Sequence, residues 1–399
     1  MSDAKKANSW ISRNLIVLSI VSFTQDAASE LMYPLMPLFL TGVLAAPAIV
    51  LGIVEGAAEV TAGVSKYFAG KASDRIGSKT LITTGYAFAG LGKLFVASAV
   101  IWPMVMFGRV VDRIGKGIRS APRDALITKS VEPNHYARAF GFHRSADTFG
   151  AVLGPVLALV GLALLNNDVR AVMWWAVIPA VLSVVISFFV QDIRVAKSVS
   201  DQVANSEQPE KLPRAFWQAA IPFIIFALTN LPDTMLLLRL SQLGTSMTNV
   251  VLAYIGFNLV YTLAAYPAGI IADRLSAYTV YAIGLLAFAI TYITLGRLTE
   301  PSPVMYVAVA VYGFFPALTD GIGKAIVSHT VPKSIHGRAQ GVFQSLSGGS
   351  ILIAGTWAGL LWSKGNGHGA LPMTLAGIVA GIGALVLLLS RSTRPLEAH

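Results

Sequence analysis

Pairs of acidic side chains lie within long apolar runs of this sequence, where a charge is costly and therefore usually has a function. Asp26 and Glu30 are four residues apart, and so are Glu55 and Glu59, which puts each pair on one face of a helix. Neighbouring carboxyl groups repel one another when both are ionised, so one of them readily holds a proton. We expect the proton carriers to come from one group of acidic residues: Asp26, Glu30, Glu55, Glu59, Asp112 and Asp147.

Basic residues accompany these acids in the first half of the chain. The seven acids include the six above and Asp124, and seven basic residues match them in number. Paired charges persist in a medium of low dielectric constant, whereas unpaired charges tend to neutralise. This balance predicts a buried ion network between the first, second, fourth and fifth helices. The basic residues that we place inside helices are Lys93, Arg109, Arg113, Lys116, Arg119, Arg123 and Arg144.

The same residues suggest where a solute could bind. A carboxylate or phosphate would be bound by Lys93, Arg109 or Arg113, although the arginines could equally hold the neighbouring acids. A cation would be bound by the carboxylates instead. Because the charges cancel, the sequence leaves the charge of the solute open. The residues that we expect to contact it are Tyr33, Lys93, Arg109, Arg113, Arg144, Asn230, Asp233 and Asn258.

Other chemistries find little support in the sequence. The chain has no cysteine, which excludes disulfides, thiol catalysis and thiolate metal sites. Its six histidines show no metal-binding spacing, and His143, four residues before Asp147, is either a proton relay or a buried, hydrogen-bonded histidine. No nucleophile–base pattern and no phosphate-binding loop is present. We expect no cofactor, no bound metal and no enzymatic activity.

The composition indicates the elements that must position these residues. Of 399 residues, 55% are hydrophobic and only 13% are charged, against roughly a quarter charged in soluble proteins. This excludes a soluble enzyme and a nucleic-acid binder. Since a membrane-spanning helix needs about 20 apolar residues, we predict an all-α polytopic membrane protein with about 12 transmembrane helices. The predicted helices lie near residues 14–42, 48–70, 80–101, 102–126, 138–165, 171–190, 214–240, 248–270, 278–296, 304–330, 338–362 and 371–390.

Charge and polarity also predict orientation and domains. Residues 191–213 are polar and lack an apolar period, which indicates a linker between an N-terminal six-helix bundle (1–190) and a C-terminal one (214–399). The net charge of +10 concentrates in alternate loops, as expected for cytoplasmic loops. We expect the linker and both termini to be cytoplasmic, in a bacterial inner (plasma) membrane.

The two halves repeat each other at an offset of about 200 residues. Gly, Asp and Arg of the stretch 70–75 recur in 269–274, and the stretch 125–141 resembles 325–341. A duplicated six-helix half is typical of transporters in which two bundles rock about a central site.

Three motifs carry a family resemblance. Residues 70–79 (GKASDRIGSK) resemble the G-x-x-x-D-R-x-G-[RK]-[RK] loop signature of the major facilitator superfamily, with Ser78 at the first basic position. Residues 150–155 (GAVLGP) are similar to the G-x-x-x-G-P motif of antiporters in that superfamily. The run 108–127 resembles a prokaryotic branch of efflux-type members. In the fourth predicted helix, Arg109-x-x-Asp112 is similar to the R-x-x-Q-G motif of the superfamily, with Arg113 where that motif has glycine.

This resemblance implies a secondary transporter that works by alternating access, with a proton-coupled antiporter that exports a small molecule as the first interpretation. The alternatives are a proton-coupled importer of a small anionic solute, a metal-ion exporter using residues such as Asp26 and His143, and a non-transporting membrane sensor. The expected partners are a small-molecule substrate, protons and the lipid bilayer, with no nucleic acid, and the expected state is a monomer. The residues assigned to a conformational gate are Gly70, Asp74, Arg75, Gly77, Lys79, Gly150, Gly154, Pro155, Asp273 and Arg274.

Overall fold

The computed structural model describes residues 11–132, 136–192, 212–331 and 336–389, and every regular element in these ranges is a helix. This confirms the prediction of an all-α chain. Contacts divide the chain into two compact units. Unit 1 contains residues 1–33 and 61–211, and unit 2 contains residues 34–60 and 212–399. The predicted division into two six-helix bundles at residues 191–213 stays a prediction.

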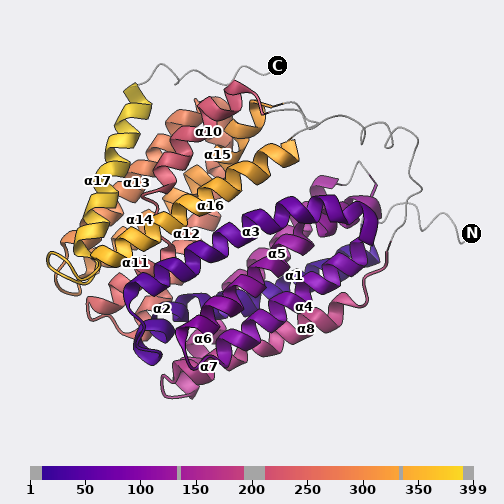
Figure 1. Cartoon of the computed structure of the whole chain (residues 1–399), viewed down its shortest axis with the longest axis horizontal. Coiled ribbons are helices and arrows are strands. Elements are labelled where there is room, and N and C mark those ends of the chain that lie inside the picture. The colour runs from indigo at the N-terminus through magenta and orange to yellow at the C-terminus, as the bar shows by residue number, and fades with distance from the viewer. Residues whose placement is uncertain (1–10, 133–135, 193–211, 332–335, 390–399) are drawn as a thin grey trace, which may run out of the picture. The chain divides into compact units, whose positions relative to one another are not determined.

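Unit 1 is a bundle of long helices that lie side by side (Figure 1). α1 packs on α6 and α8, and α4 packs on α5 and α8. A cluster of buried apolar residues, including Leu18, Tyr86 and Ile127, fills the bundle at one end. The helices are α1 (Arg13–Met32), α4 (Ser78–Ala97), α5 (Trp102–Ser130), α6 (Tyr136–Leu164), α7 (Val169–Trp175) and α8 (Val177–Ser187).

Unit 2 begins with short, irregular turns and continues with longer helices. α13 packs on α15 and α17, α10 packs on α16, and α12 packs on α14 and α15. An aromatic cluster around Phe288, Tyr292, Tyr312 and Phe315 joins α13, α14 and α15. The elements are η1 (Tyr33–Leu35, its first residue in unit 1), α2 (Met36–Leu38), η2 (Phe39–Val43), α10 (Arg214–Ala227), α11 (Asp233–Gln242), α12 (Met247–Arg274), α13 (Ala277–Arg297), α14 (Pro303–Tyr312), α15 (Phe314–His329), α16 (His336–Leu361) and α17 (Ala370–Leu389).

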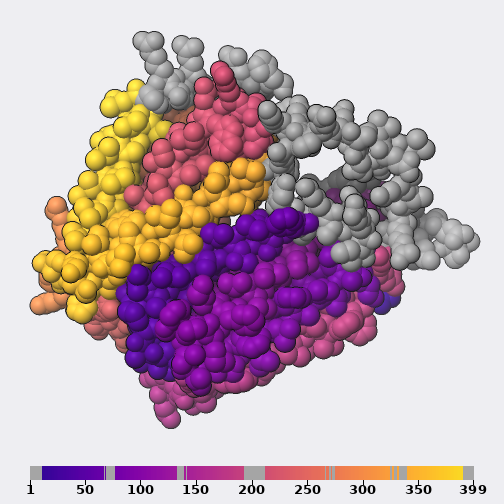
Figure 2. Space-filling model, viewed as in Figure 1, coloured from indigo at the N-terminus to yellow at the C-terminus, as the bar shows by residue number. Residues whose placement is uncertain are grey.

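The remaining helix, α3 (Ala48–Ile76), contributes its first part to unit 2 and the rest to unit 1. In unit 2 it lies against α16, as the adjoining indigo and orange atoms show (Figure 2). Gly52 on α3 and Gly355 on α16 contact each other through their backbones. Small residues permit this close approach of two membrane helices, because no side chain separates the backbones.

Nine helices in the described ranges are long and apolar enough to cross a membrane, and they coincide with nine of the predicted segments. The exact number of twelve is not confirmed. Of the other three segments, 102–126 is one helix, α5, whose charges lower its hydropathy. The segment 338–362 is helix α16. The segment 214–240, expected as one helix, is divided into α10 and α11.

Proline explains the interruption between α10 and α11. Pro232 directly precedes α11 and lacks the backbone N–H that a continuous helix requires. The corresponding region of the first segment is also irregular, since a 3₁₀ turn begins at Tyr33 and Pro34 lies within it. Both interruptions are next to residues that we expected in the site, Tyr33 and Asp233.

Candidate functional site

Charged residues of α1, α5 and α6 recur at helical spacing and remain accessible to solvent within unit 1. We call seven of these charged residues, together with Tyr33, the polar face. All are half-buried or exposed except Arg109, which is buried. Charged residues in spanning helices normally face the interior of a bundle or a water-filled path. The polar face consists of Asp26 and Glu30 on α1, Tyr33 at the start of η1, Arg109, Arg113 and Lys116 on α5, and Arg144 and Asp147 on α6.

Two aspartates meet on this face. The carboxyl groups of Asp26 and Asp147 are electrostatic neighbours, and Lys116 and Glu30 are further neighbours of Asp26. Two neighbouring carboxyl groups repel one another when both are ionised. Arg144 lies on the other side of Asp147, with its Nη1 3.5 Å from Oδ2. Asp147 therefore has both a carboxyl group and a guanidinium as neighbours.

A buried ion pair lies behind the polar face. Lys93 Nζ on α4 is 2.8 Å from Asp112 Oδ1 on α5, and the two side chains are 4% and 8% exposed. Both belonged to the expected site, Lys93 as a contact to the solute and Asp112 as a proton carrier. Their mutual contact at this depth favours a structural role for the pair. Arg109 and Arg113 are additional electrostatic neighbours of Asp112.

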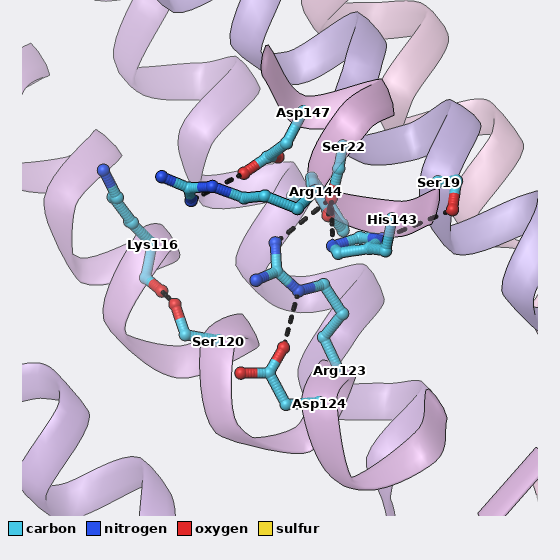
Figure 3. Close-up of polar contacts among 10 residues, drawn as sticks. Ser19, Ser22, Lys116, Ser120, Arg123, Asp124, His143, Arg144 and Asp147 are labelled. Atoms are coloured by element: carbon cyan, nitrogen blue, oxygen red, sulfur yellow. Dashed lines mark hydrogen bonds and ion pairs between the residues drawn. The ribbon is translucent and has the colours of Figure 1, made fainter. Parts of the chain in front are cut away.

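Ser22 on α1 joins three helices through one hydroxyl group (Figure 3). Its Oγ accepts a hydrogen bond from Arg123 Nη1 (3.1 Å) on α5 and lies 3.1 Å from the hydroxyl of Tyr86 and 3.4 Å from His143 Nε2. His143 Nδ1 is 3.4 Å from Ser19 Oγ. Since arginine can only donate, the Ser22 proton is available to either Tyr86 or His143.

Two hydrogen-bond arrangements satisfy this network. In one, Tyr86 donates to Ser22 and Ser22 donates to His143. In the other, His143 donates to Ser22 and Ser22 donates to Tyr86. The two differ in the tautomer of His143, so the network can change direction without moving a heavy atom. Asp124 completes it by accepting from Arg123 Nε at 3.1 Å. His143 is thus a buried, hydrogen-bonded histidine, and the network also leaves the relay interpretation open.

Glycines bring the helices of the polar face together. A Cβ atom added at Gly154 on α6 would lie 2.6 Å from the Ala27 carbonyl oxygen and 2.8 Å from Glu30 Cβ, both on α1. Gly150, one turn earlier, contacts Phe23 of α1 in the same way. Pro155 is buried within α6. The resemblance assigned these residues to a gate; the structure places them at the packing of α6 on α1, beside Glu30.

A second acidic group lies in unit 2. The Tyr312 hydroxyl donates to Asp233 Oδ1 at 2.5 Å, and Glu55, Glu59 and Asp320 are electrostatic neighbours of Asp233. Glu55 is buried, whereas Glu59 and Asp320 are exposed. Glu55 and Glu59 lie in the part of α3 that belongs to unit 2. Of the residues expected in the ion network, Glu55 and Glu59 thus belong to unit 2 and the others to unit 1.

The remaining expected contacts of unit 2 are less concentrated. Asn230 is half-buried in the interruption before α11, and Asn258 donates to the Tyr254 carbonyl of its own helix at 2.9 Å. Arg239, to which we had assigned no role, donates to the carbonyl oxygens of Leu295, Leu298 and His368. It therefore ties α11 to the end of α13 and to the turn before α17.

The structure describes only part of the loop motif at residues 70–79 and of its copy at residues 269–274. Gly77 separates α3 from α4 with φ +89°, a left-handed conformation that favours glycine, and this explains the glycine of the motif. Lys79 is half-buried in the first turn of α4. The side chains of the other loop residues in both halves lie outside the described part of the chain: Gly70, Asp74, Arg75, Asp273 and Arg274.

Sequence reasoning missed several hydroxyl groups of the site. Ser19 and Ser22 precede Asp26 by seven and four residues, so their common face with Asp26 could have been read from the spacing. Tyr86 and Tyr312 come from other helices, and no local spacing connects them to their partners.

Comparisons with known proteins agree with this architecture. A sequence profile of the Major Facilitator Superfamily matches residues 18–238 and 219–399. The chain is 26% identical over 359 residues to an uncharacterised MFS-type transporter of Methanocaldococcus jannaschii, covering 88% of this chain and 89% of that protein. The crystal structure of the nucleoside transporter NupG has a TM-score of 0.74 at 13% identity and covers 94% of this chain and 98% of that one.

Two further relatives have names that mention transport or resistance. The multidrug resistance protein MdtH of Photorhabdus laumondii subsp. laumondii is 30% identical over 142 residues, covering 36% of this chain and 35% of that protein. The cis,cis-muconate transport protein of Acinetobacter baylyi is 23% identical over 337 residues and covers 79% of each chain.

The chain therefore belongs to the Major Facilitator Superfamily, as the motif resemblance predicted. It is a multi-pass membrane transporter for a small-molecule substrate.

Proposed function

We propose that the protein is a proton-coupled antiporter that exports a small molecule by alternating access. It acts as a monomer in a bacterial inner membrane, with both termini in the cytoplasm. The observation that carries the proposal is the proximity of Asp26 and Asp147, because neighbouring carboxyl groups repel one another when both are ionised and one of them then readily holds a proton.

The charges around this pair support a coupling cycle. A proton that enters from outside neutralises the aspartate pair and weakens its attraction to Lys116 and Arg144. The substrate leaves outward, and the transporter returns with the proton. Release of the proton into the cytoplasm restores both carboxylates and the site for the next substrate. Substrate and proton thus compete for one set of charges on the polar face.

The relatives support export and leave the solute open. The relative named a multidrug resistance protein aligns over about a third of the chain, and the motif at residues 150–155 resembles that of antiporters. The relative named a muconate transport protein aligns over 79% of the chain, and its named solute is a small organic anion.

The coupling is tested in liposomes that contain the purified protein and an entrapped pH-sensitive dye. An imposed pH gradient is followed while ethidium, benzoate, uridine or D-xylose is added, one compound from each chemical class. We expect at least one of these compounds to dissipate the gradient in liposomes with protein and not in empty ones. If transport of every accepted compound is the same with and without a gradient, proton coupling is refuted.

Single substitutions of the acidic residues identify which of them carries the proton. Asp26→Asn and Asp147→Asn are expected to abolish coupled proton movement while exchange of labelled substrate at equal pH persists. Glu59→Gln is the matched control, because Glu59 is exposed and belongs to the acidic group of unit 2. Loss of coupling in Glu59→Gln or Glu55→Gln alone would move the proton site to that second group, where Asp233 is hydrogen-bonded to Tyr312.

A proton-coupled importer of a small anionic solute is the second candidate. The observation that favours it is the number of basic residues on the polar face, four against three acidic ones. The direction of substrate movement relative to protons is measured in the same liposomes. A symporter accumulates labelled benzoate together with protons, whereas an antiporter moves the two in opposite directions.

A further inference from the structure

The guanidinium of Arg123 on α5 is held from two sides (Figure 3). Its Nη1 donates to Ser22 Oγ on α1 at 3.1 Å, and its Nε donates to Asp124 Oδ1 at 3.1 Å. One anchor is thus the next residue along the chain, and the other belongs to a different helix. Because the guanidinium is rigid and planar and carries several donors, two such anchors fix the position of its charge.

This fixed charge lies close to the aspartate pair. Arg123 is an electrostatic neighbour of Asp147, which is itself a neighbour of Asp26. Ser22 precedes Asp26 by four residues on α1, and His143 precedes Asp147 by four residues on α6. Ser22 Oγ lies 3.4 Å from His143 Nε2. The anchor of the guanidinium is therefore about one helical turn from the pair on both helices.

Three cations lie beside the aspartate pair in the described part of unit 1, and they differ in their exposure to solvent. Lys116, a neighbour of Asp26, is exposed, and the side chain of Arg144, 3.5 Å from Asp147, is 74% exposed. The Arg123 side chain is only 19% exposed. Water and salt screen an exposed charge more strongly than a charge in the protein interior. Of the three, Arg123 is therefore the cation whose effect on the pair is least weakened by solvent.

Other titratable groups face the same region from four helices. They are Glu30 on α1, Tyr86 on α4, Asp124 on α5 and His143 on α6. The two acids favour protonation of a neighbouring carboxylate, because like charges repel. A fixed cation has the opposite effect, since it stabilises the ionised form of the carboxylate.

We propose that Arg123 is a positioning residue of proton coupling: its largely buried charge opposes protonation of Asp147, while Ser22 and Asp124 hold it in place. When the proton leaves the aspartate pair for solution, it leaves a carboxylate that this cation stabilises, so release is easier. Arg123 acts through Asp147 rather than on the solute. The proposal rests on the proposed function only for the statement that this proton drives transport.

The proton is followed without any substrate, by infrared spectroscopy of the purified full-length protein in lipid nanodiscs. The sample is titrated with acid and base at constant ionic strength. Protonated carboxyl groups give an absorption band that carboxylates lack, and the part of this band that is lost in Asp26→Asn and in Asp147→Asn belongs to the aspartate pair. The midpoint of that part is the measured quantity.

Substitutions of Arg123 test the effect of its charge. We expect Arg123→Gln to move the midpoint to higher pH by about one unit, as for removal of a nearby opposite charge. Arg123→Lys keeps the charge but loses the rigid fork, so its midpoint is expected between those of wild type and Arg123→Gln.

The neighbours of Arg123 test the sign of the effect and the anchors. Asp124→Asn removes a negative charge from the same place, so we expect the midpoint to move to lower pH. Ser22→Ala leaves Asp124 as an anchor and is expected to give a smaller shift to higher pH than Arg123→Gln. Arg170→Gln is the matched control and should leave the midpoint unchanged, because Arg170 belongs to the same unit but donates to the Ala99 carbonyl.

His143 is a second titratable neighbour of Arg123 and needs a separate control. The shift caused by Arg123→Gln is therefore measured again in a His143→Gln background, in which position 143 carries no titratable group. If the aspartate pair is the group that responds, the shift persists in this background.

Four outcomes overturn the proposal: the midpoint is unchanged in Arg123→Gln, Arg123→Lys moves it as far as Arg123→Gln, Arg170→Gln moves it equally, or the shift disappears in the His143→Gln background. Where Arg123→Gln does not fold, Asp124→Asn decides, since an unchanged or raised midpoint contradicts the expected sign.

The titration is independent of transport, because no gradient and no substrate are present. A protein whose midpoint shifts as expected but whose transport ignores the pH gradient refutes the proposed function and leaves the role of Arg123 standing. Conversely, an unchanged midpoint in a protein that responds to the gradient refutes only the role of Arg123.

Discussion

Lys93 and Asp112 form an ion pair of 2.8 Å between α4 and α5, and almost no solvent reaches either side chain. The pair lies where glycines bring the two helices together, since a Cβ atom at Gly92 would contact the backbone of Gly108 and the side chain of Asp112. Because the pair is closely packed and buried, removing either charge would leave the other in the protein interior without its counter-ion. The ion pair therefore connects the packing of unit 1 with the charges of its polar face.

Removing one member of this pair is expected to destabilise the protein strongly. Lys93→Met leaves Asp112 buried without its closest cation, which costs about 3–5 kcal/mol in comparable buried pairs. The double variant Lys93→Met with Asp112→Leu removes both charges and is expected to recover most of that loss. Melting temperatures in nanodiscs measure both effects, and equal destabilisation by the single and the double variant would contradict this account.

A methyl group at Gly154 should disturb the packing of α6 on α1. In Gly154→Ala the new Cβ would lie 2.6 Å from the Ala27 carbonyl oxygen, so the backbone must move. We expect a lower melting temperature and slower transport, because the shift also displaces the neighbouring Glu30. Gly256→Ala on α12 is the matched control: nothing lies within 4 Å of the new methyl group, and alanine favours helix by about 1 kcal/mol. The packing argument fails if Gly154→Ala behaves like this control.

Loss of the Ser22 hydroxyl should affect both stability and proton movement. Ser22→Ala removes an acceptor of Arg123 and the connection between Tyr86 and His143. Leaving such buried groups without a partner costs about 1–3 kcal/mol. Ser98→Ala is the control, because that hydroxyl donates only to carbonyls of its own helix.

Proton movement separates two roles of this network. If the network carries protons, Ser22→Ala and Tyr86→Phe both slow the dye response in liposomes more than they slow exchange at equal pH. Equal slowing of the two rates would show that the network is structural only.

Much of the fold could be predicted because membrane-spanning helices can be recognised as long apolar segments of the sequence. About 20 apolar residues are needed to cross a bilayer, and nine predicted segments coincide with spanning helices of the described structure. The motif at residues 70–79 was enough to indicate the family. Even the glycine at 77 has a local reason, its left-handed backbone.

The division of the seventh segment was harder to predict. Asn230 and Pro232 signal a turn, but the apolar residues on both sides continue the helical pattern. Whether such a helix bends or breaks depends on the neighbours that satisfy its freed backbone groups. For the same reason, the irregular turns after Tyr33 were not foreseen.

Within the site, spacing along a single helix predicted which residues share a face, but not their partners on other helices. Asp26 and Glu30 share a face by their four-residue separation, and the structure keeps both on the polar face of unit 1. That Asp26 meets Asp147, and Lys93 meets Asp112, depends on how closely glycines bring the helices together.

The sequence by itself determined that this chain is a helical membrane transporter with charges inside its helices. Long apolar segments, and the charges that are costly within them, can both be recognised from the order of residues along the chain. Only the tertiary structure decided how those charges are grouped. It places Glu55 and Glu59 with Asp233 in unit 2, and it leaves unit 1 with more basic than acidic residues. Electrostatic energy depends on distance in space, and residues far apart in sequence become neighbours only when helices pack.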